Sequence, residues 1–147
     1  MNKSGVAIAL GSGGARGWAH IGVLEALLEN GIRPEVVCGS SIGSLVGGAY
    51  ACGQLEQLRE WTESLSWKDL VTLMDISLGG GGLIGGERVI KHLQDRFSDY
   101  QIEELPLKFT AVATELDSGR EVWIKKGSLL KAMRASFAQP GLFSPVK

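Results

Sequence analysis

The sequence has little cysteine, almost no net charge and no long apolar run. Its two cysteines, Cys38 and Cys52, form neither a CxxC pair nor a zinc-ligand spacing with a histidine, so we expect two buried thiols in a reducing compartment. A formal net charge of −1 provides no basic surface for nucleic acid. No apolar stretch is long enough for a membrane span, and the first residues lack the pattern of a signal peptide. We therefore expect a cytoplasmic protein.

Glycine is abundant, with 21 residues in a chain of 147. The glycines are not periodic, which excludes collagen, and they cluster at 11–17, 39–48 and 79–86. Clustered glycine indicates backbone under special geometric demand. Apolar residues make up 44% of the chain and charged residues 21%, which is typical of one globular domain with a sizeable core.

Apolar runs alternate with helical patterns in the first forty residues. Val6–Leu10 predicts a buried strand, Trp18–Asn30 a helix and Glu35–Cys38 a second buried strand, which together form a βαβ unit. The pattern therefore predicts an α/β fold with a mostly parallel sheet. Further helices are predicted at Ile42–Cys52, Gln54–Leu65, Trp67–Met74, Glu87–Phe97 and Ser128–Ser136, and further strands at Lys108–Leu116 and Arg120–Lys126.

The segment Gly39-Ser40-Ser41-Ile42-Gly43 fits the pattern G-x-S-x-G, with Ser41 at its centre. In this motif a nucleophile sits on a sharp turn from strand to helix, and the residues two before and two after it must be small to avoid collision. The predicted strand before Ser41 and the small-residue helix after it supply that context. The alternative is a glycine-rich turn with a serine that takes no part in chemistry.

A second glycine loop, Gly11–Gly17, also lies between a predicted strand and a predicted helix. Its backbone N–H groups can converge on one anion, either a phosphate or an oxyanion. A phosphate-binding loop would end in G-K-[ST], and a dinucleotide site would have an acidic residue at the end of the second strand; both features are missing. Adjacent parallel strands should place this loop beside Ser41, as acyl transfer requires.

These motifs resemble the patatin-like phospholipase family, which pairs a loop ending G-G-x-R-G with a G-x-S-x-G turn. The matching stretches are "GSGGARG" and "GSSIG", and "RGWAHIGVLEAL", "FTAVATELDSGREVW" and "RASFAQPGLFSPV" extend the similarity over nearly all of the chain. Ser12 departs from the glycine of many members. The resemblance implies a three-layer α/β fold with helices on both faces of a mostly parallel sheet, of which residues 1–147 would be an N-terminal portion.

The resemblance also implies a serine–aspartate dyad that needs no metal or cofactor. Ser41 corresponds to the nucleophile, and Gly13, Gly14 and Arg16 to the oxyanion hole. The family's aspartate lies in an Asp-Gly motif beyond the stretch that matches "PGLFSPV", and no such dipeptide occurs in this chain, so we expect the single domain to be truncated before it. The remaining motif glycines are Gly17, Gly39 and Gly43.

No other residue is a convincing base for Ser41. His92 is expected on a polar helix face, His20 in a packing or capping role, and Asp117 in a turn, while Asp75 has no evident partner. The loop 79–86 is either a mobile flap that meets lipid or a plain connector.

The predicted function is therefore hydrolysis of lipid acyl esters, as in a phospholipase, a lysophospholipase or an esterase. The expected partner is a lipid, with peripheral membrane contact and without nucleotide or nucleic acid. The alternative is a non-catalytic module that binds a lipid or an anionic ligand through the glycine loop.

Overall fold

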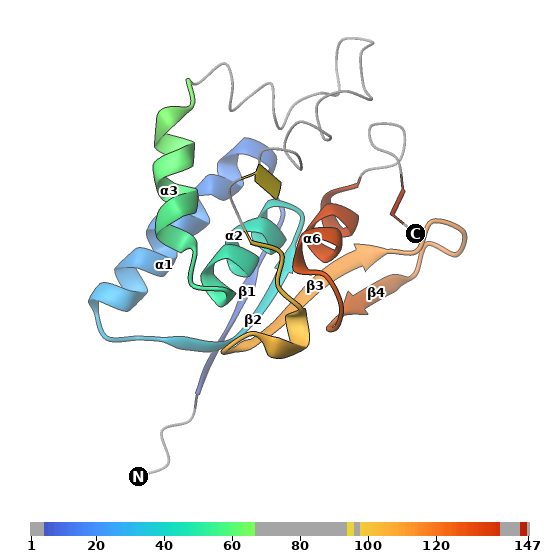
Figure 1. Ribbon diagram of the computed structural model, residues 1–147, viewed down its shortest axis with the longest axis horizontal. Helices are drawn as coiled ribbons and strands as arrows, with labels where there is room; N and C mark the ends of the chain where they lie inside the picture. The colour runs from blue at the N-terminus through green and yellow to red at the C-terminus, as the bar shows by residue number, and fades with distance from the viewer. Residues whose placement is uncertain (1–4, 67–93, 96–97, 139–144, 147) are drawn as a thin grey trace.

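A four-stranded sheet lies at the centre of the computed structural model, which describes residues 5–66, 94–95, 98–138 and 145–146 (Figure 1). The strands follow one another across the sheet in chain order, β1-β2-β3-β4. The first three run parallel, and β4 returns antiparallel to β3 as a hairpin. Their bounds are β1 Val6–Leu10, β2 Pro34–Ser40, β3 Lys108–Thr114 and β4 Glu121–Ile124.

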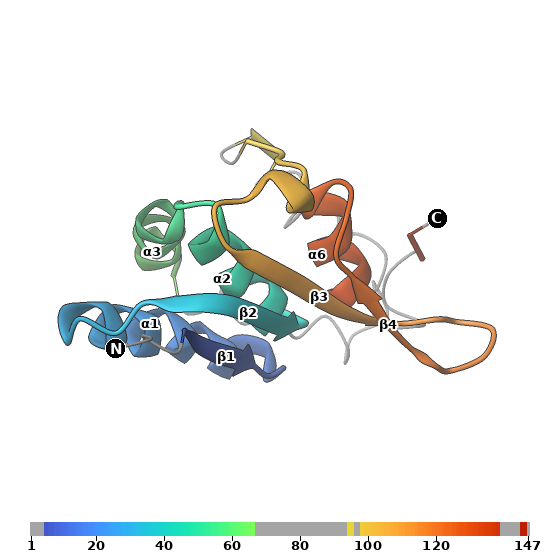
Figure 2. The same cartoon turned by 90° about the horizontal axis from the view of Figure 1, so that it is seen from below.

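Helices connect and flank these strands (Figure 2). A short 3₁₀ helix, η1, occupies Gly14–Trp18 directly after β1, and a second one, η3, precedes β3. The α/β class with a mostly parallel sheet flanked by helices is confirmed. The helix bounds are α1 Ala19–Glu29, α2 Ile42–Ala51, α3 Leu55–Ser64, η3 Ile102–Glu104 and α6 Leu129–Phe137.

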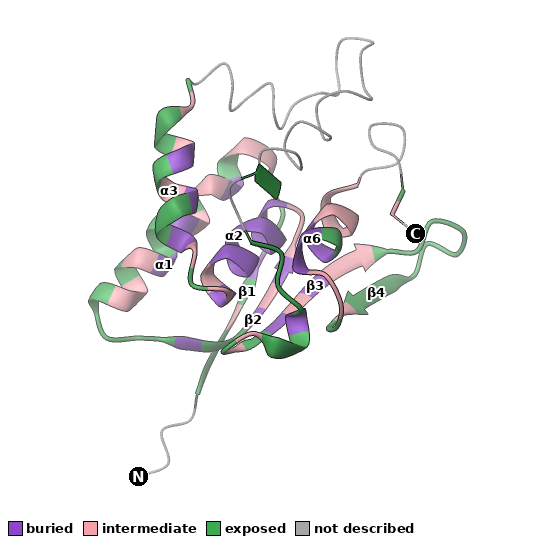
Figure 3. Cartoon of the chain, viewed as in Figure 1, coloured by how far each residue is buried: buried purple, intermediate pink, exposed green. Residues whose placement is uncertain are grey.

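Helix α2 is the most buried element, as its purple ribbon shows in Figure 3, and its glycines allow close packing. A Cβ atom on Gly47 would lie 2.8 Å from a Val37 methyl group on β2. A Cβ atom on Gly48 would lie 2.7 Å from the Met133 sulfur on α6. Each interior glycine costs a helix about 1 kcal/mol in propensity. The close contact with the sheet and with α6 offsets that cost, because buried apolar surface stabilises the fold.

Strand β2 alternates in burial, so the two faces of the sheet differ. Val37 is fully buried under α2, whereas the next residue back, Val36, is 39% exposed. Val112 on β3 is paired with both Ser40 on β2 and Trp123 on β4, so these three side chains lie on one face. Because side chains alternate along a strand, this is also the face of Val36, and Trp123 on it is 54% exposed. Among the described residues, this face carries exposed apolar side chains.

Helices α1 and α3 pack beside each other at the β1 side of the molecule (Figure 1). The Trp18 and Trp61 rings meet edge to face, with centroids 6.0 Å apart. Arg59 on α3 forms an ion pair with Glu25 on α1 at 3.3 Å. Gly31 follows α1 with a φ of 74°, a conformation that glycine adopts without strain at a helix end.

Some sequence predictions are corrected here and some fall outside the described residues. The helix expected from Trp18 begins one residue later, because residues 14–18 wind as a 3₁₀ helix. Cys38 and Cys52 are free but half-buried, not buried. Helix Trp67–Met74, the loop 79–86 and most of Glu87–Phe97 lie outside the described residues. Within the described ranges, no helix combines the length and the hydropathy that crossing a bilayer needs.

Candidate active site

The two glycine motifs lie at the same edge of the sheet. Strands β1 and β2 are parallel and paired, with Leu10 opposite Gly39, so the two strands end at neighbouring points on the same edge of the sheet. The loop that begins at Gly11 and the turn that holds Ser41 are therefore adjacent. In open α/β sheets, ligands bind in the crevice outside these carboxyl ends.

Ser41 stands on a strained turn between β2 and α2. Its φ is 54° and its ψ is −121°, and no other non-glycine residue in the described part of the chain has a positive φ. Such backbone costs on the order of 1–3 kcal/mol and persists only where the surroundings impose it. Strained backbone between a strand and a helix is also typical of the turns that carry a nucleophilic serine in other α/β proteins.

Gly39 and Gly43 are glycines because the turn leaves no room for a side chain. A Cβ atom on Gly39 would lie 2.5 Å from the Ser44 Cα atom across the turn. A Cβ atom on Gly43 would overlap the Leu10 carbonyl oxygen and lie 2.6 Å from that of Gly11. The atoms in the way are mostly backbone, so no side chain can swing aside. The spacing of the motif is thus a steric requirement of this turn.

The glycine loop packs directly on the start of α2. A Cβ atom on Gly17 would overlap the Ile42 side chain, so the loop and the residue after Ser41 are in contact. Gly14 has a φ of 53°, and the Arg16 N–H donates to the Gly13 carbonyl at 3.1 Å, which closes the first turn of η1. The first N–H groups of a helix have no partner within it, so the amides at the start of η1 can serve as donors to a ligand.

His20 supports the loop from α1. Its Nε2 atom donates to the Gly11 carbonyl at 2.9 Å, which ties the root of the loop to the helix that follows it. A packing or capping role was expected for His20 from sequence, and the contact observed is this hydrogen bond to the backbone of the loop. The Trp18 indole N–H is buried and has no hydrogen-bond partner among the described residues.

Two serines outside the predicted set hold Ser41 in place. The Ser44 hydroxyl is fully buried and donates to the Ser41 carbonyl at 2.7 Å. The Ser136 hydroxyl on α6 accepts from the Ser41 N–H at 2.8 Å and donates to the Val112 carbonyl at 2.6 Å. Ser44 falls one turn after Ser41 in the motif, which is a usable sequence signal. Ser136 is 95 residues away and has none.

Of the residues considered as bases, the structure describes His20 and Asp117, and neither has a hydrogen bond to Ser41. Asp117 is exposed in the turn between β3 and β4, where the Gly119 N–H donates to the Glu115 carbonyl at 2.9 Å. Asp75 and His92 lie outside the described residues. The Arg16 side chain is exposed. In the described ranges, no three His, Cys, Asp or Glu side chains gather as a metal site.

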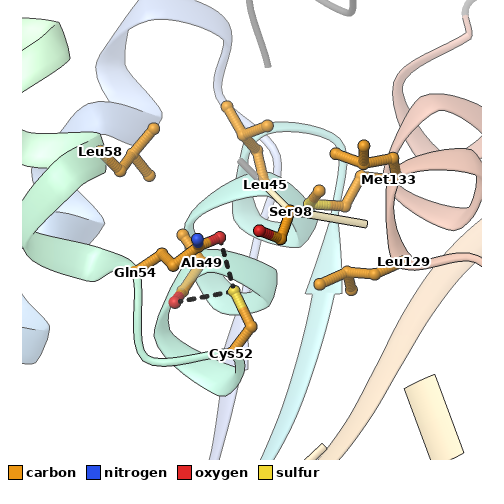
Figure 4. Close-up of a pocket in the computed structure, with 9 residues that line it drawn as sticks. Leu45, Ala49, Cys52, Gln54, Leu58, Ser98, Leu129 and Met133 are labelled. Carbon is orange, nitrogen blue, oxygen red and sulfur yellow. Dashed lines mark hydrogen bonds between the residues drawn. The ribbon is translucent and has the colours of Figure 1, made fainter. Parts of the chain in front are cut away.

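A small apolar cavity lies away from the turn, among α2, α3 and α6 (Figure 4). Its volume of about 10 Å³ holds roughly one water molecule. Leu45, Ala49 and Met133 contribute to its wall, and Cys52 points into the same region, where burial raises the pKa of its thiol to about 11. The cavity is too small to hold an acyl chain.

Comparison of the sequence with known proteins finds matches over nearly the whole chain. A family model described as "Patatin-like phospholipase" matches residues 8–147. An uncharacterised NTE family protein of Mycobacterium tuberculosis is 44% identical over 140 residues, which is 95% of this chain and 39% of the relative. Human patatin-like phospholipase domain-containing protein 6 is 35% identical over 146 residues, covering 96% of this chain and 10% of that protein. The neuropathy target esterase sws of Drosophila sechellia is 30% identical over 151 residues, covering 99% and 10%. The chain thus spans well under half the length of these relatives.

Proposed function

The chain belongs to the patatin-like phospholipase family, and we propose that it carries the nucleophile and the oxyanion hole of a lipid acyl ester hydrolase. Family membership supports action on lipids in general terms. The observation that carries the finer proposal is the strained backbone of Ser41, held against a glycine loop whose amides can meet a developing negative charge. Strain of this kind at a serine in this turn is characteristic of a nucleophile.

In the proposed reaction, the Ser41 oxygen attacks the acyl carbon of the ester and loses its proton to a base. The carbonyl oxygen becomes an oxyanion, which the N–H groups of Gly13 and Gly14 stabilise, with the Arg16 charge nearby. The carbon–oxygen bond to the leaving alcohol then breaks, and the alcohol takes the proton from the base. Water, activated by the same base, hydrolyses the acyl-serine and regenerates the free hydroxyl.

We further propose that this base is an aspartate outside the 147 residues. Support comes from the mycobacterial relative, of which the chain covers 39%, and from the lack of an Asp-Gly dipeptide in this sequence. General base catalysis contributes about 10²–10⁴-fold in rate. The reading frame around this sequence provides the first test. A stop codon directly after Lys147 would contradict the proposal.

Labelling with a fluorophosphonate tests the nucleophile in the protein expressed from its full reading frame. We expect covalent labelling at Ser41 and its loss in Ser41→Ala. Ser40→Ala is the matched control, because Ser40 is the neighbouring serine on β2 and should leave labelling intact. A folded protein that does not label, yet binds a lipid or an anion, would favour the non-catalytic binding module instead.

We also propose that the β3–β4 hairpin meets the lipid surface that supplies the substrate. Leu116 at the hairpin turn is 58% exposed and Trp123 on β4 is 54% exposed, and tryptophan favours the membrane interface. The hairpin leaves the sheet at the edge that holds Ser41, because β2 and β3 are parallel. In vesicle co-sedimentation, the double variant Leu116→Ser with Trp123→Ala should bind less. Ile32→Ser, at the opposite edge, is the control, and an equal effect of both would refute this role.

A further inference from the structure

A single hydroxyl joins the nucleophile turn to the neighbouring strand. The hydroxyl of Ser136, on α6, accepts a hydrogen bond from the Ser41 N–H at 2.8 Å. The same oxygen donates its own proton to the Val112 carbonyl at 2.6 Å. Both roles of the hydroxyl are therefore filled, one by the elbow and one by β3.

The Ser41 N–H needs an acceptor from outside the sheet because of its position just beyond the paired strands. Ser40 is the last residue of β2 that pairs with β3, and its partner is Val112. Ser41 comes next, and its positive φ turns the chain away from the sheet. Its N–H is the first donor beyond the paired residues. A backbone N–H that is shielded from water and left without a hydrogen-bond partner destabilises the fold, so an acceptor is needed at this point.

We propose that Ser136 is a positioning residue that fixes the Ser41 elbow for attack. This inference rests on the proposed hydrolase function. With its N–H bound to Ser136, Ser41 cannot donate that proton to an oxyanion. The donors for the oxyanion then come from the glycine loop on the other side of the elbow.

Ser136 belongs to helix α6, which packs against α2 and β3. The N-terminal cap of the helix, where the Ser128 hydroxyl accepts from the Lys131 N–H at 3.1 Å, lies at the other end of α6 and has no hydrogen bond to the turn at Ser41. The middle of α6 packs closely on α2. The Met133 sulfur lies only 2.7 Å from the position that a Cβ atom on Gly48 would take. Groups that position a catalytic atom work best from rigid elements. The group that bridges to Ser41 therefore belongs to a helix packed against the core, and not to a loop.

Steady-state kinetics on the protein from its full reading frame test this role. Ser136→Ala should lower kcat by about 10–100-fold, as small misplacements of a reacting group do, and change KM by less than about threefold. Ser136→Thr retains the hydroxyl and should restore most of kcat. Ser128→Ala is the matched control, since it removes a hydroxyl from the same helix at its far end. It should lower the melting temperature but keep kcat within about twofold.

Three results would overturn the inference. One is an unchanged kcat in folded Ser136→Ala, and another is an equal loss in Ser136→Ala and Ser128→Ala, which would indicate a purely structural role. The third needs no variant and no activity. In amide hydrogen exchange of the unaltered protein, the Ser41 N–H should be protected, and rapid exchange would show that the bridge is missing. If the unaltered protein does not label with a fluorophosphonate while its Ser41 amide is protected, the hydrolase function is refuted and the bridge stands.

Discussion

Replacing Gly43 by alanine should destabilise the fold through one steric conflict. The added methyl group would overlap the Leu10 carbonyl oxygen and lie 2.6 Å from the Gly11 carbonyl oxygen. Both obstacles are backbone, so β1 or α2 has to shift. Overpacking of this kind costs about 1–3 kcal/mol, and the helix propensity of alanine returns at most about 1 kcal/mol. With rigid obstacles we expect the upper end of that cost, a net loss of about 2 kcal/mol.

Gly22→Ala supplies the matched control on α1. Gly22 is also helical, but its new methyl group would meet no atom within 4 Å, so only the gain in helix propensity remains. That variant should be stabilised by up to about 1 kcal/mol. The two variants share the chemical change, so the difference of about 3 kcal/mol between them measures the clash alone.

Urea denaturation and thermal melting measure both variants. For a chain of this size, 1 kcal/mol shifts the melting temperature by about 2–4 °C. The control should therefore melt a few degrees higher than the unaltered protein, and Gly43→Ala several degrees lower. Gly43→Ala should also lose fluorophosphonate labelling, because the shift occurs at the root of the glycine loop. If both variants melt at the same temperature, the contact between α2 and β1 is not as tight as described.

Three further predictions concern other parts of the molecule. Gly17→Ala should destabilise the protein because its methyl group would overlap Ile42, and Ile42→Ala in the same chain should recover part of the loss; purely additive effects in urea would refute this contact. Burial holds the pKa of the Cys52 thiol at about 11, so in a Cys38→Ala background it should react with Ellman's reagent far more slowly at pH 8 than after unfolding in urea; equal rates would contradict the burial. Leu58→Ala should cost about 2–5 kcal/mol in urea, because this side chain is fully buried between α3 and the core, and a loss below about 1 kcal/mol would contradict that packing.

The local parts of the fold follow well from sequence. Val6–Leu10 is a strand with the predicted bounds, since a short apolar run between polar residues and glycine is a local signal. The glycine-rich helix after Ser41 also forms as predicted, at Ile42–Ala51. The 3₁₀ helix at Gly14–Trp18 was not predicted from sequence, and within it Gly17 packs against Ile42 on α2. That contact is set by tertiary packing, which no periodicity reports.

The site divides in the same way. The neighbouring positions of the two turns follow from parallel strand pairing, which the sequence indicates. The anchoring of Ser41 does not follow from sequence, since Ser136 lies 95 residues away and one serine among many carries no pattern. The chemical roles of Ser41, Gly13, Gly14 and Arg16 stay predictions until labelling and kinetics test them.

The hydrogen bond between Ser41 and Ser136 also has a consequence for the order in which the turn forms during synthesis. A ribosome releases the chain from its N-terminus, so the strand, the serine and its helix emerge well before the clamping hydroxyl, 95 residues further on. A nascent chain that ends before α6 therefore contains Ser41 without the Ser136 hydroxyl that accepts from its N–H. The turn at Ser41 is thus completed only after all four described strands, the last of which ends at Ile124, have been made.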